Sequence, residues 1–272
     1  MDPVTVGIIG TVGVFGLLFL GMHIAFALML VGFIGISYLA SFQAALPVVA
    51  RATYEAAAHY PYTVIPLFIV MGGFASSSGL TKDMYGAFDK WLRKLPGGLG
   101  IATIGACAGF SAVSGSSVAT AATMGMVALP EMERYGYHPK LATASVAAGG
   151  TLGFLIPPSI GFVVYGMLTE QSIGKLLVAG MIPGILLAGA YAGTILVWVK
   201  LNPKLAPVEP QAVTWGEKVR SLLGVWESLA LFLIVMGGIY LGLFTPTEAG
   251  AVGATALFLV ALAKRRLTWD NL

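Results

Sequence analysis

The sequence has few charged residues and therefore little that could cover a protein surface in water. Lys, Arg, Asp and Glu make up 10% of the 272 residues, while 57% of the residues are hydrophobic. An ordinary soluble domain has about 25% charged residues. Apolar runs recur along the whole chain, and about 20 apolar residues suffice for a helix to cross a bilayer. The composition predicts an all-α integral membrane protein.

The scarcity of metal-ligating and nucleophilic side chains excludes further classes of site. Cys107 is the only cysteine, so neither an internal disulfide nor a multi-cysteine metal site can form. The three histidines, His23, His59 and His138, lie at predicted turns, and none is spaced from another as metal ligands are. No basic patch suits nucleic acid. We therefore expect neither a metal site built from cysteine and histidine nor a nucleic-acid-binding surface.

The hydrophobic pattern predicts about seven transmembrane helices and two helices that lie in the membrane interface. Lys82 to Leu95 has apolar residues at helical spacing, and Lys90, Arg93 and Lys94 are expected to face the headgroups. Thr214 and Glu217 have the spacing of a capping box, which opens the second interfacial helix. The expected spans are residues 4–20, 24–41, 61–80, 138–169, 173–199, 224–243 and 247–263.

The apolar segment 98–132 is interrupted by the run SAVSGSS at 111–117. The interruption leaves halves of about 15 residues, each about 22 Å long as a helix. Neither half crosses a hydrocarbon core of about 30 Å comfortably. We expect a re-entrant helical hairpin that enters and leaves on the same side, with its tip near the midplane.

The segment 138–169 is interrupted by the run GGTLGFLIPPS at 149–159, and we expect it to form one discontinuous helix. Lipid offers no hydrogen-bond partner to free backbone groups, so irregular backbone at membrane depth lines a cavity or is buried in protein. Two such interruptions in one chain predict a binding site at membrane depth.

The chemistry at the two interruptions is that of hydroxyl and peptide groups, with no ionisable side chain. Hard cations prefer oxygen ligands, and the C-terminal end of a half-helix adds partial negative charge. The free N–H groups at the start of the second half-helix suit a carboxylate. The alternative to a binding site is that these small residues only allow helices to pack closely, and this alternative applies above all to the run 120–123. The candidate site residues are Ser111, Ser114, Gly115, Ser116, Ser117, Thr120, Gly149, Gly150, Thr151, Gly153, Pro157, Pro158 and Ser159.

The basic residues are distributed unevenly over the predicted loops. With an outer N-terminus and a hairpin that returns to its own side, only Arg51 and Lys175 lie outside. If the segment 98–132 crossed the membrane completely, the later loops would change sides and this asymmetry would shrink. The distribution therefore favours the re-entrant hairpin. The inner basic residues are Lys82, Lys90, Arg93, Lys94, Arg134, Lys140, Lys200, Lys204, Lys218, Arg220, Lys264, Arg265 and Arg266.

Three runs of sequence resemble one family of membrane proteins. The run from Gly109 to Glu170 (GFSAVSGSSVATAATMGMVALPEMERYGYHPKLATASVAAGGTLGFLIPPSIGFVVYGMLTE) resembles the large membrane subunit of tripartite ATP-independent periplasmic (TRAP) transporters. The same holds for IPLFIVMGGFASSSGL at 65–80 and GIYLGLFTPTEAGAVGA at 238–254. The likeness covers nearly the whole chain.

The resemblance implies sodium-driven import of a small carboxylate-bearing solute across the bacterial inner membrane. The implied partners are a small TRAP membrane subunit and a periplasmic solute-binding protein. The implied mechanism is that of an elevator, in which a transport domain moves against a scaffold. The implied cofactor is Na⁺, bound at the hairpin tip and the helix break, with Ser114, Ser116, Gly149 and Thr151 as the expected ligands.

The resemblance also divides the chain into parts with different roles, and the distribution of basic residues gives it an orientation. The N-terminus would be periplasmic and the C-terminus of this chain cytoplasmic. The parts are N-terminal scaffold spans at 1–81, an arm helix at 82–97, the transport-domain hairpin at 98–132 and discontinuous helix at 138–169, a scaffold span with an inner arm segment at 172–223, and the start of a second repeat at 224–272.

One departure from the family pattern affects what the chain can do alone. The family's large subunit commonly contains two inverted repeats, whereas this sequence reaches Leu272 without a second Ser-rich hairpin or a second Pro-Pro pair. A second polypeptide that supplies the missing repeat is therefore among the expected partners. The alternatives to a transporter are a non-transporting assembly subunit, a truncated half-transporter and, remotely, an intramembrane serine hydrolase.

Overall fold

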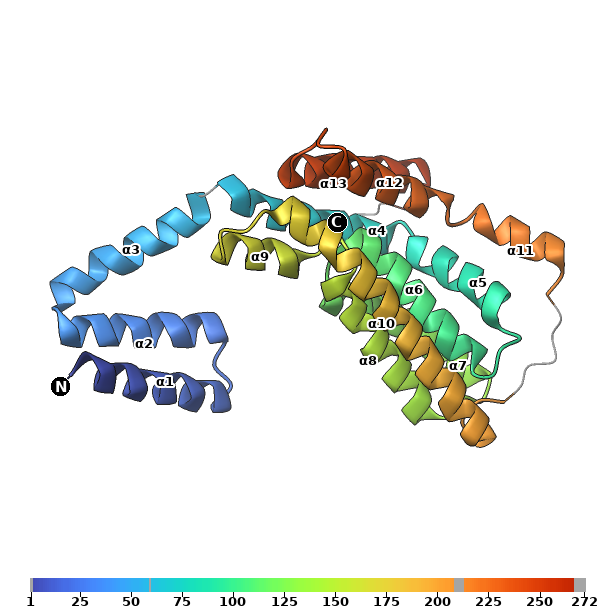
Figure 1. Cartoon of the computed structure of the whole chain (residues 1–272), viewed down its shortest axis with the longest axis horizontal. Coiled ribbons are helices and arrows are strands. Elements are labelled where there is room, and N and C mark those ends of the chain that lie inside the picture. The colour runs from blue at the N-terminus through green and yellow to red at the C-terminus, as the bar shows by residue number, and fades with distance from the viewer. Residues whose placement is uncertain (1, 59, 208–212, 267–272) are drawn as a thin grey trace. The chain divides into compact units, whose positions relative to one another are not determined.

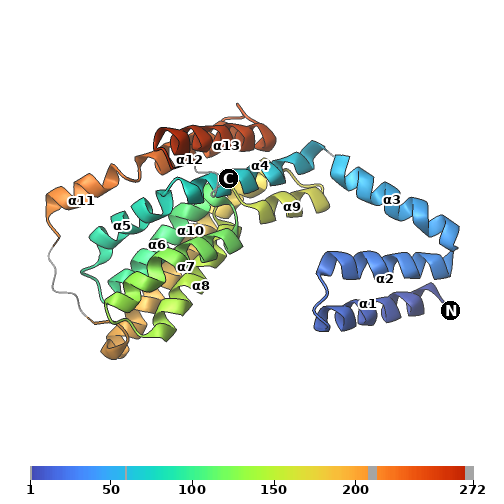
Figure 2. The ribbon, with the colours of Figure 1, turned by 180° about the vertical axis from the view of Figure 1, so that it is seen from behind.

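The computed structural model describes residues 2–58, 60–207 and 213–266, which contain helices and turns but no strand. The chain divides into two compact units, residues 1–62 and 63–272. Figures 1 and 2 show the helices from opposite sides. The all-helical architecture expected from the composition is confirmed for the described residues.

The first unit contains three helices, and α2 packs against both of the others. Gly10 of α1 lies against Val31 of α2 and allows the two helices to approach closely. The third helix is a regular α-helix whose Arg51 and Glu55 form an exposed ion pair. The helices are α1 (Pro3–Phe19), α2 (Ile24–Leu39) and α3 (Phe42–Ala58), followed by the 3₁₀ turn η1 (Tyr60–Thr63).

The second unit holds the main hydrophobic core, and its centre is a bundle of α6, α7, α8 and α10 that lie side by side in Figures 1 and 2. Helix α4 packs against both α6 and α13. The helices are α4 (Val64–Ser77), α5 (Leu80–Leu92), α6 (Gly98–Ser114), α7 (Ser117–Arg134), α8 (Pro139–Leu155), α9 (Ile160–Leu168), α10 (Ile173–Leu201), η2 (Pro203–Leu205), α11 (Trp215–Leu222), α12 (Trp226–Tyr240) and α13 (Pro246–Ala263).

Helices α6 and α7 form an antiparallel hairpin. At its base, the backbone N–H of Leu99 donates to the Tyr137 hydroxyl at 3.1 Å. Thr103 Oγ1 lies 3.6 Å from Met132 Sδ further up. Near the tip, the hydroxyls of Ser111 and Thr120 lie 3.4 Å apart. The chain therefore enters and leaves this segment at adjacent points, as expected for a hairpin, and a single straight span over 98–132 is excluded.

Helix α8 packs along both arms of the hairpin, and its glycines make the close approach possible. A Cβ atom on Gly149 would lie 2.6 Å from Cys107 Sγ, and one on Gly150 would lie 2.6 Å from the Cβ of Ala121. Real side-chain atoms do not approach so closely, so both positions exclude any larger residue. Cys107 is buried in this contact, as a small packing residue.

The discontinuous helix is confirmed, but the break is shorter than the sequence indicated. Helix α8 continues to Leu155, α9 begins at Ile160, and the two are bent by 43°. Gly149, Gly150 and Gly153 were expected to open the backbone, yet they lie within α8. The glycines serve close packing because neighbouring helices leave no room for a side chain, and the break itself consists of residues 156–159.

Among the described residues, three helical segments are long and apolar enough to cross a membrane: 60–77, 173–201 and 246–263. The bent pairs α8 with α9 and α11 with α12 raise this number to five if each pair is one span. Helices α1, α2 and α6 are apolar but shorter. The expected number of about seven spans stays a prediction.

The arm helices differ in one respect from the sequence-based expectation. The capping box at Thr214 and Glu217 is present and opens α11. Helix α5 packs against both α6 and α11. However, Arg93 does not face the headgroups: it forms an ion pair with Asp89 and lies over the Tyr135 ring, 5.3 Å from its centroid. The prediction was wrong here because a partner one turn away and the aromatic ring of Tyr135, just after α7, offer the guanidinium a protein environment.

Candidate functional site

The hairpin tip is a sharp reversal of two residues. Gly115 has φ of +64°, a left-handed conformation that favours glycine, and it ends α6. Ser116 follows in extended conformation, and its hydroxyl oxygen accepts a hydrogen bond from the backbone N–H of Ala119, 3.3 Å away. Ser116 is therefore the N-cap of α7, a position that serine favours.

A cluster of buried hydroxyl groups lies directly below this tip. Thr120 Oγ1 is 3.0 Å from Ser114 Oγ and 3.4 Å from Ser111 Oγ, and all three side chains are at most 1% exposed. One turn further along α7, Thr123 Oγ1 lies 3.3 Å from Ser76 Oγ of α4. Hydroxyl oxygens from three helices thus line the hairpin where it faces α4.

The break between α8 and α9 meets the hairpin tip. The backbone N–H of Ile160 donates to the carbonyl oxygen of Gly115 at 3.0 Å. A Cβ atom on Gly115 would lie 2.7 Å from the Pro158 carbonyl oxygen, and one on Gly153 would lie 2.7 Å from the Ser117 nitrogen. The two interruptions of the sequence are therefore in direct contact.

Ser159 stabilises the second half of the broken helix. Its hydroxyl donates to the Phe154 carbonyl oxygen at 2.6 Å and accepts from the Phe162 N–H at 3.4 Å. It caps α9 in the same way as Ser116 caps α7. Pro157 and Pro158, joined by a cis peptide bond, form the buried connection before it.

Four helix ends meet at this place: the C-termini of α6 and α8 and the N-termini of α7 and α9. Helix C-termini carry partial negative charge and N-termini partial positive charge. Within the described residues, no group of three or more His, Cys, Asp or Glu side chains could hold a metal ion. A cation here would be held by hydroxyl and carbonyl oxygens, the ligands that hard cations prefer, so the residues present fit an alkali cation.

Two of the residues expected to bind the cation lie elsewhere. The Thr151 hydroxyl donates to the Ala148 carbonyl oxygen at 2.7 Å and lies 3.1 Å from the Tyr191 hydroxyl of α10. Gly149 lies against Cys107 in the packing contact of α8 with α6. The structure brings together Ser111, Ser114, Gly115, Ser116, Ser117, Thr120, Gly153, Pro158 and Ser159 by direct contacts, whereas Gly149, Gly150 and Thr151 face other neighbours.

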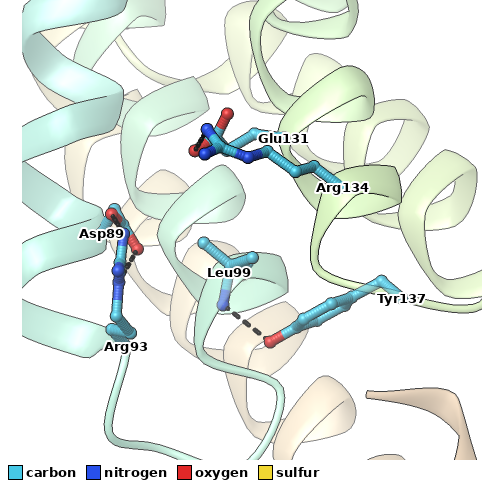
Figure 3. A network of polar contacts seen from close by, with 6 residues as sticks. All are labelled: Asp89, Arg93, Leu99, Glu131, Arg134 and Tyr137. Atoms are coloured by element: carbon cyan, nitrogen blue, oxygen red, sulfur yellow. Dashed lines mark hydrogen bonds and ion pairs between the residues drawn. The ribbon is translucent and has the colours of Figure 1, made fainter. Parts of the chain in front are cut away.

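A polar network lies at the base of the hairpin, and the sequence analysis did not predict it. Arg93 Nε donates to Asp89 Oδ1 at 3.0 Å, and both side chains are nearly buried, with 13% and 9% exposure. Figure 3 shows this pair on α5 and the Tyr137 hydroxyl directed at Leu99. The arm helix α5 is joined to the hairpin through Arg93, whose guanidinium lies over the ring of Tyr135, the residue that follows α7. This ion pair could have been predicted from the sequence, because Asp89 and Arg93 lie four residues apart on the apolar face of an amphipathic helix.

The family match and the individual relatives of this chain all indicate the same family of proteins. The family described as "Tripartite ATP-independent periplasmic transporter, DctM component" matches residues 11–272. The C4-dicarboxylate TRAP transporter large permease protein of Pseudomonas aeruginosa is 40% identical over 209 residues, which are 77% of this chain and 48% of the relative. The corresponding protein of Vibrio cholerae is 38% identical over 252 residues, 91% of this chain and 54% of the relative.

A sialic acid TRAP transporter large permease protein of Vibrio cholerae is 32% identical over 258 residues, covering 94% of this chain and 59% of that relative. The chain thus spans about half the length of the curated relatives that it matches.

Proposed function

Because the chain belongs to the family of TRAP transporter large permeases, we propose that it takes part in sodium-coupled import of a small carboxylate-bearing solute. The named relatives are permeases and not enzymes. Their names give C4-dicarboxylates and sialic acid as substrates, and both classes carry carboxylates.

The meeting of the two helix breaks is the observation that carries this proposal. The buried hydroxyls of Ser111, Ser114 and Thr120 provide oxygen ligands without a formal charge, so a cation can bind and leave without a proton being exchanged. The N-termini of α7 and α9, capped by Ser116 and Ser159, provide partial positive charge for a carboxylate. Cation and anion would stabilise one another in a region of low dielectric.

The contacts also suggest which part would move. The hairpin and helices α8 and α9 are joined through the Gly115 to Ile160 hydrogen bond and the glycine contacts, and would form the transport domain of an elevator. The first spans and α10 would belong to the scaffold, and α5 and α11 would be the arms between them. The hairpin would be re-entrant, because its two ends lie side by side and its tip meets the break in the middle of the discontinuous helix.

The proposed setting is the bacterial inner membrane, with the N-terminus in the periplasm and the C-terminus of this chain in the cytoplasm. A periplasmic solute-binding protein would deliver the solute, and a small membrane subunit would complete the scaffold. Since the chain spans about half of its relatives, the second repeat is a further proposed component.

Reconstitution into liposomes tests the proposal. The chain is combined with its small subunit, its binding protein and the second repeat, and uptake of radiolabelled C4-dicarboxylate and sialic acid is followed. We expect uptake only with an inward sodium gradient, and none when K⁺ replaces Na⁺. Assembly of the complex without uptake of either solute under any gradient would identify an assembly subunit instead.

A further inference from the structure

An apolar groove separates the arm helix α5 from the start of α12, outside the site described above. Its volume is about 560 Å³, within the range of about 300–1,000 Å³ typical of small-molecule sites. Every lining side chain is apolar or aromatic. The lining residues are Ala87, Phe88, Trp91 and Leu92 of α5 together with Leu222, Val225, Trp226 and Leu229.

Aromatic residues mark one edge of this groove as a membrane interface. Trp91 and Trp226 belong to the lining and are 37% and 59% exposed. Tryptophan is enriched at headgroup depth because its ring is apolar while its N–H is polar. The Trp91 Nε1–H donates to the backbone carbonyl oxygen of Lys218, 3.2 Å away, which attaches α11 to α5 beside the groove.

A cation lies next to this aromatic edge. Lys218 Nζ is 5.5 Å from the ring centroids of both Trp91 and Trp215, and the two rings meet edge to face at 6.0 Å. Indole rings hold an ammonium group by cation–π attraction and leave its formal charge uncompensated. A lysine that is held in this way can still attract an anion.

The carboxylates of the neighbouring elements already have partners. Glu217, the one acidic residue of α11, accepts hydrogen bonds from the backbone N–H and hydroxyl of Thr214. Asp83 and Glu227 both contact Lys264. Asp89 is paired with Arg93. Helix α11 also carries Arg220, so its basic residues outnumber its one acidic residue.

We propose that the groove binds an anionic phospholipid, with an acyl chain against the apolar lining and the phosphate beside Lys218. Basic pockets between helices on the inner side of a membrane bind anionic headgroups in this way. Protein segments could also bury the apolar lining, but the uncompensated charge of Lys218 at the aromatic edge favours a phosphate. A bound lipid would fill the space between the arm helix and α12 and couple the arm to the bilayer.

Native mass spectrometry of the detergent-extracted chain tests this inference, with phosphatidylglycerol and phosphatidylcholine added in equal amounts. The wild-type chain should retain phosphatidylglycerol preferentially. Lys218→Gln should reduce that preference about fivefold, since one basic residue near a membrane surface contributes about that factor. Lys140→Gln, an exposed lysine at the start of α8, should not change the preference.

A second pair of variants tests the groove itself. Leu229→Trp fills the groove and should lower retention of both lipids. Leu233→Trp, one turn further along α12, is the control, because both leucines are 59% exposed but only Leu229 lines the groove. Equal lipid retention in wild type, Lys218→Gln and Leu229→Trp would overturn the proposal. So would the loss, in Leu229→Trp, of a bound second copy or partner protein instead of a lipid.

Discussion

At the scale of single residues, the site depends on buried hydroxyl groups that hydrogen-bond to one another. Thr120 is the centre of this arrangement, because its hydroxyl lies within 3.4 Å of both Ser111 and Ser114. A buried hydroxyl that loses its partner costs about 1–3 kcal/mol, because no water replaces the lost bond. Buried hydroxyl groups are therefore expected where they hydrogen-bond to one another or bind a ligand.

Thr120→Val tests this role with little change of shape. We expect the free energy of unfolding to fall by about 1–3 kcal/mol, because the hydroxyls of Ser111 and Ser114 lose a partner. The stabilisation of the wild type by NaCl over choline chloride, measured as a shift of Tm, should vanish. Thr194→Val on α10, where the exposed hydroxyl bonds only to its own helix, is the control and should change stability by less than about 0.5 kcal/mol.

Asp89→Asn tests the ion pair at the hairpin base. Removing one partner of a buried pair leaves the other charge without compensation, so we expect a loss of about 3 kcal/mol in the free energy of unfolding. The control is Glu55→Gln in the pair with Arg51, whose side chains are 59% and 80% exposed, and it should cost less than about 1 kcal/mol. Equal Tm shifts for both variants would show that the Asp89 pair has no structural role.

At the scale of elements, the site exists because glycine residues allow the two helix breaks to contact each other directly. Gly153 of α8 lies against the backbone of Ser116 and Ser117, where the second arm of the hairpin begins. Backbone atoms cannot rotate away as a flexible side chain can. The distance between α8 and the hairpin tip is therefore set by this glycine.

Gly153→Ala should separate α8 from the tip. A Cβ atom would lie 2.7–2.8 Å from three backbone atoms of Ser116 and Ser117, and we expect a loss of about 1–3 kcal/mol in stability together with loss of the sodium-dependent Tm shift. Gly189→Ala on α10, where nothing lies within 4 Å of the new atom, should instead stabilise the helix by up to about 1 kcal/mol. Unchanged sodium dependence in Gly153→Ala would contradict the role of this contact.

At the scale of the whole molecule, the charge distribution and the hairpin geometry both bear on the orientation in the membrane. The hydrogen bond from Leu99 to Tyr137 places the entry and exit of the hairpin side by side. The loops before and after it should therefore lie on the same side of the bilayer, the side on which basic residues accumulate.

Cysteine labelling in intact cells measures this orientation, and the native Cys107 does not interfere because it is fully buried. Lys94→Cys and Lys140→Cys should both resist a membrane-impermeant thiol reagent, whereas Glu170→Cys, after the discontinuous helix, should react. If Lys140→Cys reacted while Lys94→Cys did not, the two ends of the hairpin would lie on opposite sides of the membrane and the proposed topology would be wrong.

Much of the fold and part of the site could be predicted because their causes are local. Gly115 at the tip, the capping box at Thr214 and the break before Ser159 each follow from what one or two residues do to their own backbone. The contact of Thr151 could not be predicted, because its partner Tyr191 lies on another helix. For Arg93 the partner four residues earlier, Asp89, could be predicted, whereas the ring of Tyr135 could not.

The sequence by itself determined that this chain is a helical membrane protein, which family it belongs to and where its helices break, since hydrophobicity and backbone preferences act within a few residues. Only the tertiary structure decided that the two breaks meet, that the glycines of α8 serve packing and that Thr151 faces Tyr191. The reason is physical: contacts between helices depend on how their surfaces fit together, and residues distant in sequence supply those surfaces.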